Sequence, residues 1–332
     1  MENLFSKFVF AAWLALGLAV SFFLFLLTSV SAGTHYRFFE INNGQGFRAI
    51  AQSLSDEKLI RSKTAFVAYG AISGSAHRLK PGSYLISVGS STPAILNTLV
   101  RGPIIDKKVT IIEGLTIKDI DAVISNEKIL QPGEIYKFLI KDLKSGYEFL
   151  KGVKTLEGFL FPDTYKFFLQ GDKKEVIGKL LDNFNKKAWP LLRDQKDFYE
   201  KLIIASLLEK EAPEFNDRRL IAGILYKRLK LGMPLQVDAA VIYAKCKWAF
   251  MTCESTKLAR KDFGLQSPYN TYLYNGLPPG PIGNPGLEAI TAAIYPLSSD
   301  YLYYLSDPKT KKTIFSKTFD EHNDNRAKYL GI

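Results

Sequence analysis

The first pattern along the chain is an uninterrupted apolar run close to the N-terminus. Residues 8–34 contain no charged side chain, and residues 8–30 are almost wholly apolar. About 20 such residues are enough to cross the hydrocarbon core of a bilayer. The run predicts a single membrane-spanning anchor at residues 8–30, with residues 1–7 in the cytoplasm and the bulk of the chain outside it.

A cleaved signal peptide is the alternative to an anchor. Val30, Ser31 and Ala32 form a small-residue segment of the kind found at cleavage sites, and Lys7 precedes the apolar run. The run is longer than the usual signal-peptide core of about 7 to 15 residues, which favours the anchor. Both interpretations place most of the chain outside the cytoplasm.

Beyond the run, apolar positions alternate between strand and helix periods. Residues 36–41 predict a strand and residues 42–46 a turn, and the helix that follows has one apolar face. A turn and a strand are expected over residues 79–86, and Ser91 or Thr92 can cap a further helix. Residues 34–106 therefore predict a small α+β module. The expected apolar helix positions are Phe47, Ile50, Ala51, Leu54, Ile95, Leu96 and Leu99.

The same order of elements returns at residues 109–120, which read as a strand, a glycine turn and an amphipathic helix. The ends of the two helices are also alike, at residues 56–60 and 126–130. Two copies are too few for a solenoid, which needs about three or more repeats. The pattern indicates a duplicated supersecondary unit.

From Asp172 onward the pattern is mostly helical. One helix can begin at Asp194 or Asp197 and must end before Pro213, because the residue before a proline avoids the α region. The next begins near Asn216 or Asp217 and ends at Gly232. After a loop rich in proline and glycine, a helix (287–293), two strands (301–305 and 313–315) and a final helix are expected. Residues 107–332 thus predict a mainly helical, mixed α/β domain, and the whole chain an α+β protein.

Composition and charge narrow the partners. Apolar residues make up 47% of the chain, so long disordered stretches are not expected. Forty-four Lys and Arg against 33 Asp and Glu give a net charge of +11 that is dispersed along the chain. Dispersed positive charge suits membrane head groups or an anionic polymer, or is an ordinary solvated surface. No zinc-finger spacing or RNA-binding signature accompanies it, so nucleic acid is not an expected partner.

The chain has two cysteines, Cys246 and Cys253, with six residues between them. In an extracytoplasmic domain this spacing favours a disulfide that closes a small loop, and two free thiols are the alternative. The three histidines, His35, His77 and His322, are far from the pair and from one another. We therefore expect no metal site and no cofactor.

Two carboxyls stand at the end of the helix that precedes Pro213. With 100° per residue, Glu209 falls beside the small side chains of Ala205 and Ser206, whereas Glu211 falls within a sector of bulky aliphatic side chains. This placement leaves room for a ligand over Glu209 and suggests a structural partner for Glu211. The negative end of the helix dipole should raise both pKa values, as a general acid requires, although such residues are also common at solvated helix ends.

Several spaced segments make the pattern specific. They are 205–211 (ASLLEKE), 226–238 (YKRLKLGMPLQVD), 267–272 (SPYNTY) and 276–286 (GLPPGPIGNPG), with 156–165 (LEGFLFPDTY) upstream and 321–323 (EHN) downstream. The segment 205–211 resembles the Ala-Ser-x-x-Glu-Lys-Glu signature of the YceG-like family of endolytic murein transglycosylases, and the other segments resemble motifs of the same family in the same order. Together with the N-terminal anchor, the resemblance covers nearly the whole chain.

The resemblance implies a membrane-anchored enzyme that faces the cell wall and cuts internal bonds of peptidoglycan glycan strands. It implies that Glu209 is the catalytic acid, that residues 34–106 form a LysM-like module, and that peptidoglycan synthases are partners. A single acid would suffice, because the C6 hydroxyl of the cleaved sugar supplies the nucleophile and leaves a 1,6-anhydro end. The segment from Cys246 to Cys253 departs from the family pattern. The candidates for substrate binding are Glu211, Gln236, Asp238, Tyr269, Asn270, Thr271 and Tyr272.

Other interpretations remain open. Residues 269–272 also read as a turn in which the Asn side chain binds its own backbone, and Asp238 as a helix cap. The enzyme could be a hydrolytic muramidase, with Asp238 or Glu211 as the base that activates water. A non-catalytic, membrane-tethered glycan-binding scaffold is the alternative from another class of protein.

Overall fold

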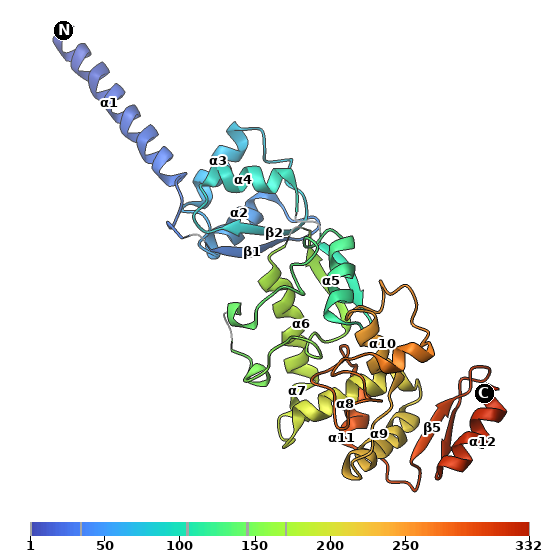
Figure 1. Ribbon diagram of the computed structural model, residues 1–332. Helices are drawn as coiled ribbons and strands as arrows, with labels where there is room; N and C mark the ends of the chain where they lie inside the picture. Colours follow the sequence, from blue (N-terminus) through green and yellow to red (C-terminus); the bar gives the residue numbers. More distant parts are fainter. Residues whose placement is uncertain (1, 34, 104–105, 144–145, 170, 332) are drawn as a thin grey trace. The chain divides into compact units, whose positions relative to one another are not determined.

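The computed structural model describes residues 2–33, 35–103, 106–143, 146–169 and 171–331 (Figure 1). The chain folds into two compact units, Met1–Asp106 and Lys107–Ile332. Each unit has a hydrophobic core of its own.

The first unit begins with α1 (Glu2–Leu26), whose segment Val9–Leu26 is long and apolar enough to cross a membrane and has all its side chains on the surface. The helix ends earlier than the predicted anchor, which extended to residue 30. Two contacts explain the end. The Thr28 hydroxyl donates to the Phe25 carbonyl, and the Leu27 carbonyl accepts a hydrogen bond from the Thr92 backbone.

The rest of the first unit is an α+β module, as the sequence predicted. Strands β1 (Tyr36–Ile41) and β2 (Gly82–Ser87) pair antiparallel, with Tyr36 opposite Ser87. Helices α2 (Phe47–Asp56), α3 (Lys63–Ile72) and α4 (Thr92–Arg101) complete it. Ser91, one of the two predicted caps, accepts a hydrogen bond from the Ala94 backbone. Helix α3 was not expected, because its largely apolar sequence has no clear amphipathic period.

The second unit starts with a copy of the same strand–turn–helix sequence, β3 (Asp106–Ile111) and α5 (Ile117–Asn126). Strand β3 pairs with β4 (Asp163–Phe168). In both copies the turn glycine has a positive φ, 79° at Gly44 and 74° at Gly114, and a lysine in the left-handed region follows the helix, Lys58 and Lys128. The predicted duplication is therefore confirmed in the backbone conformation.

The remaining elements of the second unit surround α8 (Phe198–Glu211). Helices α9 (Phe215–Lys230), α10 (Asp238–Lys245) and α11 (Leu287–Ile294) pack against it. A two-stranded sheet, β5 (Tyr303–Ser306) and β6 (Thr313–Ser316), carries α12 (Phe319–Leu330), and α6 (Lys173–Lys187) and α7 (Trp189–Leu192) precede α8. Short 3-10 turns lie at Ile140–Asp142, Glu148–Leu150 and Arg260–Gly264.

Helix α8 is buried on all sides over residues 202–208, so it forms the centre of the core rather than its edge. It ends as the sequence predicted, because Ala212, the residue before Pro213, is extended (φ −146°, ψ 142°). The buried centre holds the end of α8 rigidly. Glu209 and Glu211, the two predicted acids, stand at this end.

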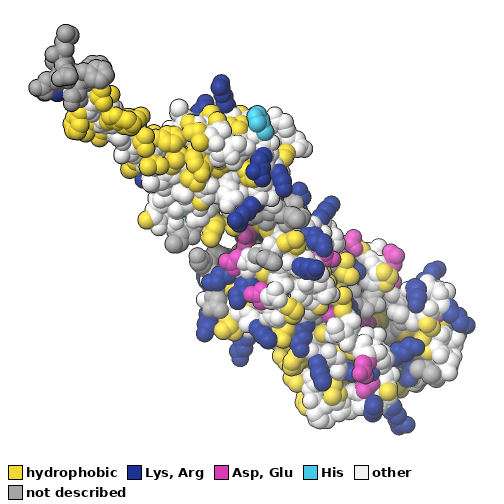
Figure 2. Space-filling view, turned by 90° about the horizontal axis from the view of Figure 1, so that it is seen from above, with side chains coloured by type: hydrophobic (Ala, Val, Ile, Leu, Met, Phe, Trp, Pro, Cys, Tyr) yellow, Lys and Arg dark blue, Asp and Glu magenta, His cyan; other side chains and the backbone are white. Residues whose placement is uncertain are grey.

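Basic residues are spread over the surface. On the face drawn in Figure 2, Lys and Arg side chains are scattered among acidic and uncharged ones rather than gathered into one patch. The predicted dispersion of the positive charge in sequence thus holds in space on this face.

Candidate active site

The two glutamates of α8 have different surroundings. The Glu209 side chain is 6% exposed, and both its oxygens have partners: Arg218 donates to Oε1 at 3.0 Å and the Gly286 backbone to Oε2 at 2.7 Å. Burial raises the pKa of Glu209, the hydrogen bond from Gly286 and the charge of Arg218 lower it, and the charge of Glu113 raises it. Hydrogen bonds to both oxygens thus fix the orientation of the Glu209 carboxyl.

The space that the helical wheel left over Ala205 and Ser206 is filled by the loop before α11. The Ser206 hydroxyl accepts a hydrogen bond from the Ile282 backbone at 3.0 Å. Gly286, four residues later in the same loop, donates its backbone N–H to Glu209. The small side chains of the signature therefore provide a docking surface for the Gly-Pro-rich loop.

Glu211 instead lines a cavity of about 650 Å³, the larger of the two cavities described below. Burial raises the pKa of Glu211 to about 7, although the hydrogen bond from the Tyr304 hydroxyl lowers it. The negative charge of Asp238 contributes further to the rise. The helical positions predicted bulky aliphatic neighbours for Glu211. Because Glu211 is the last residue of α8, its neighbours instead come from β5 (Tyr304) and α10 (Asp238).

Three more of the predicted binding residues line the same cavity: Gln236, Asp238 and Tyr272. The Tyr272 hydroxyl donates to Asp238 at 2.6 Å, and Arg228 donates to the Gln236 side chain at 3.3 Å. Gln236 has a φ of 56°, a left-handed conformation that costs energy for a residue other than glycine. The fold thus brings Gln236, Asp238 and Tyr272 to the end of α8.

The other predicted binding residues hold the loop itself. Asn270 and Thr271 are buried, and their side chains bind backbone groups. Asn270 donates to the carbonyls of Phe263 and Leu265, and the Thr271 hydroxyl accepts from the Val237 backbone at 2.9 Å. The alternative interpretation as a turn describes these two residues. Tyr269 packs on Tyr243, with ring centroids 5.0 Å apart.

The cavity wall also contains residues that were not singled out from the sequence as site residues, among them Arg228, Tyr304 and His322. Arg228 is buried, donates to the carbonyls of Leu302 and Leu235, and lies 5.0 Å from the Tyr303 ring centroid. His322 has a buried Nδ1 atom that finds no hydrogen-bond partner among the residues that the structure describes. In the sequence, Tyr304 belongs to the aromatic strand at 301–305 and His322 to the Glu-His-Asn segment. Their positions in the sequence do not indicate that they face this cavity.

A buried polar network fixes the loops behind α8. Asn284 accepts from the Leu160 backbone at 2.8 Å and donates to the Leu115 carbonyl at 2.8 Å and to Glu157 at 3.1 Å. Glu157 also accepts from the Tyr243 hydroxyl, and its burial raises its pKa to about 8. This network ties the turn between β3 and α5 to the loop before α11 and to α10.

The smaller cavity, about 370 Å³, lies beside the loop before α11 and is lined by Glu113, Asp163, Lys187 and Gly286 among others. The Lys187 and Asn183 side chains hold the pKa of Asp163 at about 2. Among the residues that the structure describes, Glu209 belongs to the walls of neither cavity, although its partner Gly286 lines this one.

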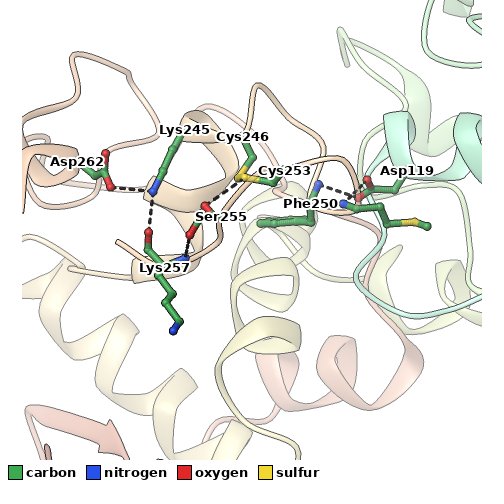
Figure 3. Close-up of a disulfide and its surroundings, with 9 residues drawn as sticks. Asp119, Lys245, Cys246, Phe250, Cys253, Ser255, Lys257 and Asp262 are labelled. Carbon is green, nitrogen blue, oxygen red and sulfur yellow. Dashed lines mark hydrogen bonds and ion pairs between the residues drawn. A yellow bond between two sulfur atoms is a disulfide. The ribbon is translucent and has the colours of Figure 1, made fainter. Parts of the chain in front are cut away.

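Cys246 and Cys253 form the predicted disulfide, with Cα atoms 5.1 Å apart (Figure 3). The loop it closes is bound to α5, because Asp119 accepts from the backbones of Phe250 (3.2 Å) and Met251 (2.9 Å). The Phe250 ring lies under the Lys210 ammonium, 4.6 Å from its centroid. Lys210 stands between the two glutamates of α8, so the loop contacts the end of that helix.

A carboxyl with a raised pKa, a second carboxylate and several aromatic rings around one polar cavity define a site suited to acid–base chemistry on a polar, ring-containing ligand. The model of the YceG-like family matches residues 39–328, and the chain belongs to that family.

The relatives are peptidoglycan enzymes by name. An endolytic murein transglycosylase of Bacillus subtilis (strain 168) is 33% identical over 309 residues, which cover 87% of this chain and 84% of that protein. An endolytic murein transglycosylase of Streptococcus pneumoniae (serotype 2, strain D39) is 29% identical over 330 residues, covering 87% of this chain and 58% of that protein. A crystal structure of a yceG-like protein from Listeria monocytogenes has 32% identity and a TM-score of 0.53, and the match covers 88% of this chain and 100% of that one.

Proposed function

We propose that the chain is an endolytic peptidoglycan lytic transglycosylase whose active site is the larger cavity. It would cleave the bond between N-acetylmuramic acid and N-acetylglucosamine within nascent glycan strands and so limit their elongation. Support comes from the family, from the names of the relatives, and above all from the carboxyl of Glu211 in the wall of a polar, aromatic-lined cavity.

The sequence predicted Glu209 as the acid, and Glu209 stays a candidate; the proposed reaction is written with Glu211 as the acid, because Glu211 lines the cavity. Glu209 has a cation on one oxygen and a backbone donor on the other, and both lower its pKa, but burial has the larger effect and the pKa of Glu209 remains raised. Glu211 lines the cavity and has a pKa of about 7, so a large share of it carries a proton near neutral pH. Glu209 would then hold the loop before α11 against α8.

The proposed reaction needs one acid and no water. Protonated Glu211 gives its proton to the oxygen between the two sugars as that bond breaks. The C6 hydroxyl of the muramic acid residue attacks its own C1, and its proton passes to the Glu211 carboxylate. This restores the acid and leaves a 1,6-anhydro end. The negative charge of Asp238, oriented by Tyr272, would stabilise the positive charge that develops on the sugar ring.

The segment Val9–Leu26 supports a place for the enzyme at the cell membrane. We propose that α1 is an uncleaved, single-pass anchor, with residues 1–7 in the cytoplasm and both folded units on the cell-wall side. Strands are polymerised at that surface, so peptidoglycan synthases are the expected neighbours. A mature N-terminus beginning near residue 33 in protein isolated from cells would identify a signal peptide instead.

The first unit is proposed to be a LysM-like glycan-binding module, on the basis of its strand–helix order and the resemblance of its sequence. A structural spacer with the same fold is the alternative. Shifts of NMR signals from residues 34–106 on adding N-acetylglucosamine oligomers would support the binding role, and unchanged signals would favour the spacer.

The test of the function compares two isosteric variants at neighbouring positions of α8. The full chain in detergent is incubated with purified, uncross-linked glycan strands, and the products are identified by mass spectrometry. We expect internal fragments with 1,6-anhydro ends from the wild type, and a loss of at least about a hundredfold in rate for Glu211→Gln. Glu209→Gln should retain the reaction, with a lower melting temperature from the weakened bond to Arg218.

Each other result has a definite meaning. A hundredfold loss in Glu209→Gln with an active Glu211→Gln would move the acid to Glu209. Reducing ends without anhydro sugars would identify a hydrolytic muramidase. Intact strands that bind equally to the wild type and both variants would identify a glycan-binding scaffold.

A further inference from the structure

The loop closed by the disulfide carries an exposed indole in an unusual backbone setting. Lys247 and Trp248 both have positive φ values, 52° and 67°, and such consecutive left-handed residues cost energy unless the surroundings impose them. Two sets of contacts hold this conformation. The Cys246–Cys253 disulfide closes the loop around it, and the backbones of Phe250 and Met251 donate hydrogen bonds to the buried Asp119. The indole is nevertheless 50% exposed.

A second exposed ring stands beside it. The Lys118 ammonium lies 5.2 Å from the Trp248 ring centroid and 5.6 Å from that of Tyr136, which is 44% exposed. The same ammonium donates to the Lys247 carbonyl at 2.9 Å, so it fixes α5, the disulfide loop and Tyr136 relative to one another. We call Trp248, Tyr136 and Lys118 the aromatic platform.

We propose that the aromatic platform binds a glycan strand outside the cleavage cavity, by stacking sugar rings on Trp248 and Tyr136. Sugar rings have apolar C–H faces and polar edges. The platform offers apolar ring faces together with the Lys118 ammonium and the indole N–H as donors. This inference rests on the proposed function in one respect: it takes the occupant to be another stretch of the strand that enters the cavity.

The position of the platform fits that occupant. Helix α10 starts at Asp238, which lines the cavity, and ends at Lys245, next to Cys246 and the disulfide loop. Eight helical residues span about 12 Å, a length that a few linked sugars cover. An enzyme that cuts within a strand must hold sugars on both sides of the broken bond. A cavity of about 650 Å³ encloses only a short part of such a polymer.

The experiment measures binding of strands without turnover. The full chain carrying both Glu209→Gln and Glu211→Gln, in detergent, is titrated with peptide-free, uncross-linked glycan strands and separately with the tetrasaccharide of the same polymer. Adding Trp248→Ala should raise the Kd for long strands about tenfold, the equivalent of one well-placed contact. The Kd for the tetrasaccharide should change less than about twofold. Trp248→Phe should retain most of the affinity.

Tyr295→Ala is the matched control, because Tyr295 is an equally exposed aromatic residue (54%) on another part of the same unit. It should leave both Kd values unchanged. An unchanged Kd for long strands in Trp248→Ala, or an equal loss for long and short ligands, would overturn the proposal. A strand-binding platform in a chain that cleaves nothing would leave this inference standing and remove the proposed function. Cleavage with full affinity in Trp248→Ala would do the reverse.

Discussion

Glu209 and Glu211 are two residues apart on one helix and differ in almost every physical respect. Glu209 is enclosed by Arg218 and the backbone of Gly286, and Glu211 faces a cavity and a tyrosine hydroxyl. Both have raised pKa values because both are buried. The pKa alone therefore does not select the acid. We propose Glu211 because it lines the cavity, where a ligand can receive its proton, and Glu209 stays the acid that the sequence predicted.

The Tyr304 hydroxyl lowers the pKa of Glu211 by donating a hydrogen bond to its carboxylate, against the larger effect of burial. The proposed reaction needs protonated Glu211, so its rate should fall as the pH rises through about 7. Tyr304→Phe removes the donor, so we expect the falling limb of the pH–rate profile to move to higher pH. The measurement is the rate of anhydro-product formation between pH 5 and 9.

Tyr301→Phe is the control for this profile, because the Tyr301 ring stacks on Phe315 outside the wall of the cavity. Its limb should coincide with that of the wild type. A limb that stays in place in Tyr304→Phe would show that Glu211 does not set the pH dependence.

At the scale of elements, the loop before α11 depends on a close approach of two backbones. A Cβ atom on Gly283 would lie 2.7 Å from the Gly114 carbonyl oxygen, in the turn between β3 and α5. Gly114 donates to the Asn284 carbonyl at 2.8 Å, and Asn284 donates back to the Leu115 carbonyl. The two turns thus meet as backbone against backbone over the end of α8.

Gly283→Ala should therefore destabilise the second unit by about 1–3 kcal/mol, the usual cost of overpacking. It should also reduce cleavage, because the loop holds Glu209 and the end of α8. Chemical unfolding and the cleavage assay measure the two effects. Gly264→Ala is the control, since a Cβ atom there meets nothing within 4 Å, and it should stay within about 0.5 kcal/mol of the wild type. Equal stability of the two variants would contradict the close approach.

Much of the element order could be predicted because its signals are local. Asp172 caps α6, Pro213 ends α8 and Gly232 ends α9, as their residue types imply. The two acids and the disulfide pair were also visible in the sequence. The cavity was not, because its walls come from α8, α10, β5 and α12, which only tertiary packing brings together. A helical wheel gives the angle of a side chain around the helix axis but not its position along that axis. It therefore placed beside Glu211 aliphatic side chains that belong to earlier turns of α8.

At the scale of the whole molecule, two separate cores stabilise the two units. Leu99 is fully buried in the core of the first unit, and Leu180 is fully buried in the core of the second. No residue belongs to both clusters among those that the structure describes. Two cores of this kind should give two unfolding transitions, because cooperativity depends on shared packing.

Calorimetry on the full chain in detergent tests this division. Leu99→Ala and Leu180→Ala make the same change in the two cores, and each should cost its own unit about 2–5 kcal/mol. Leu99→Ala should lower the melting temperature of one transition and leave the other in place, and Leu180→Ala should do the opposite. If both variants shift a single common transition, the units fold as one cooperative body. In that case α1 and the first unit would contribute to the stability of the second unit.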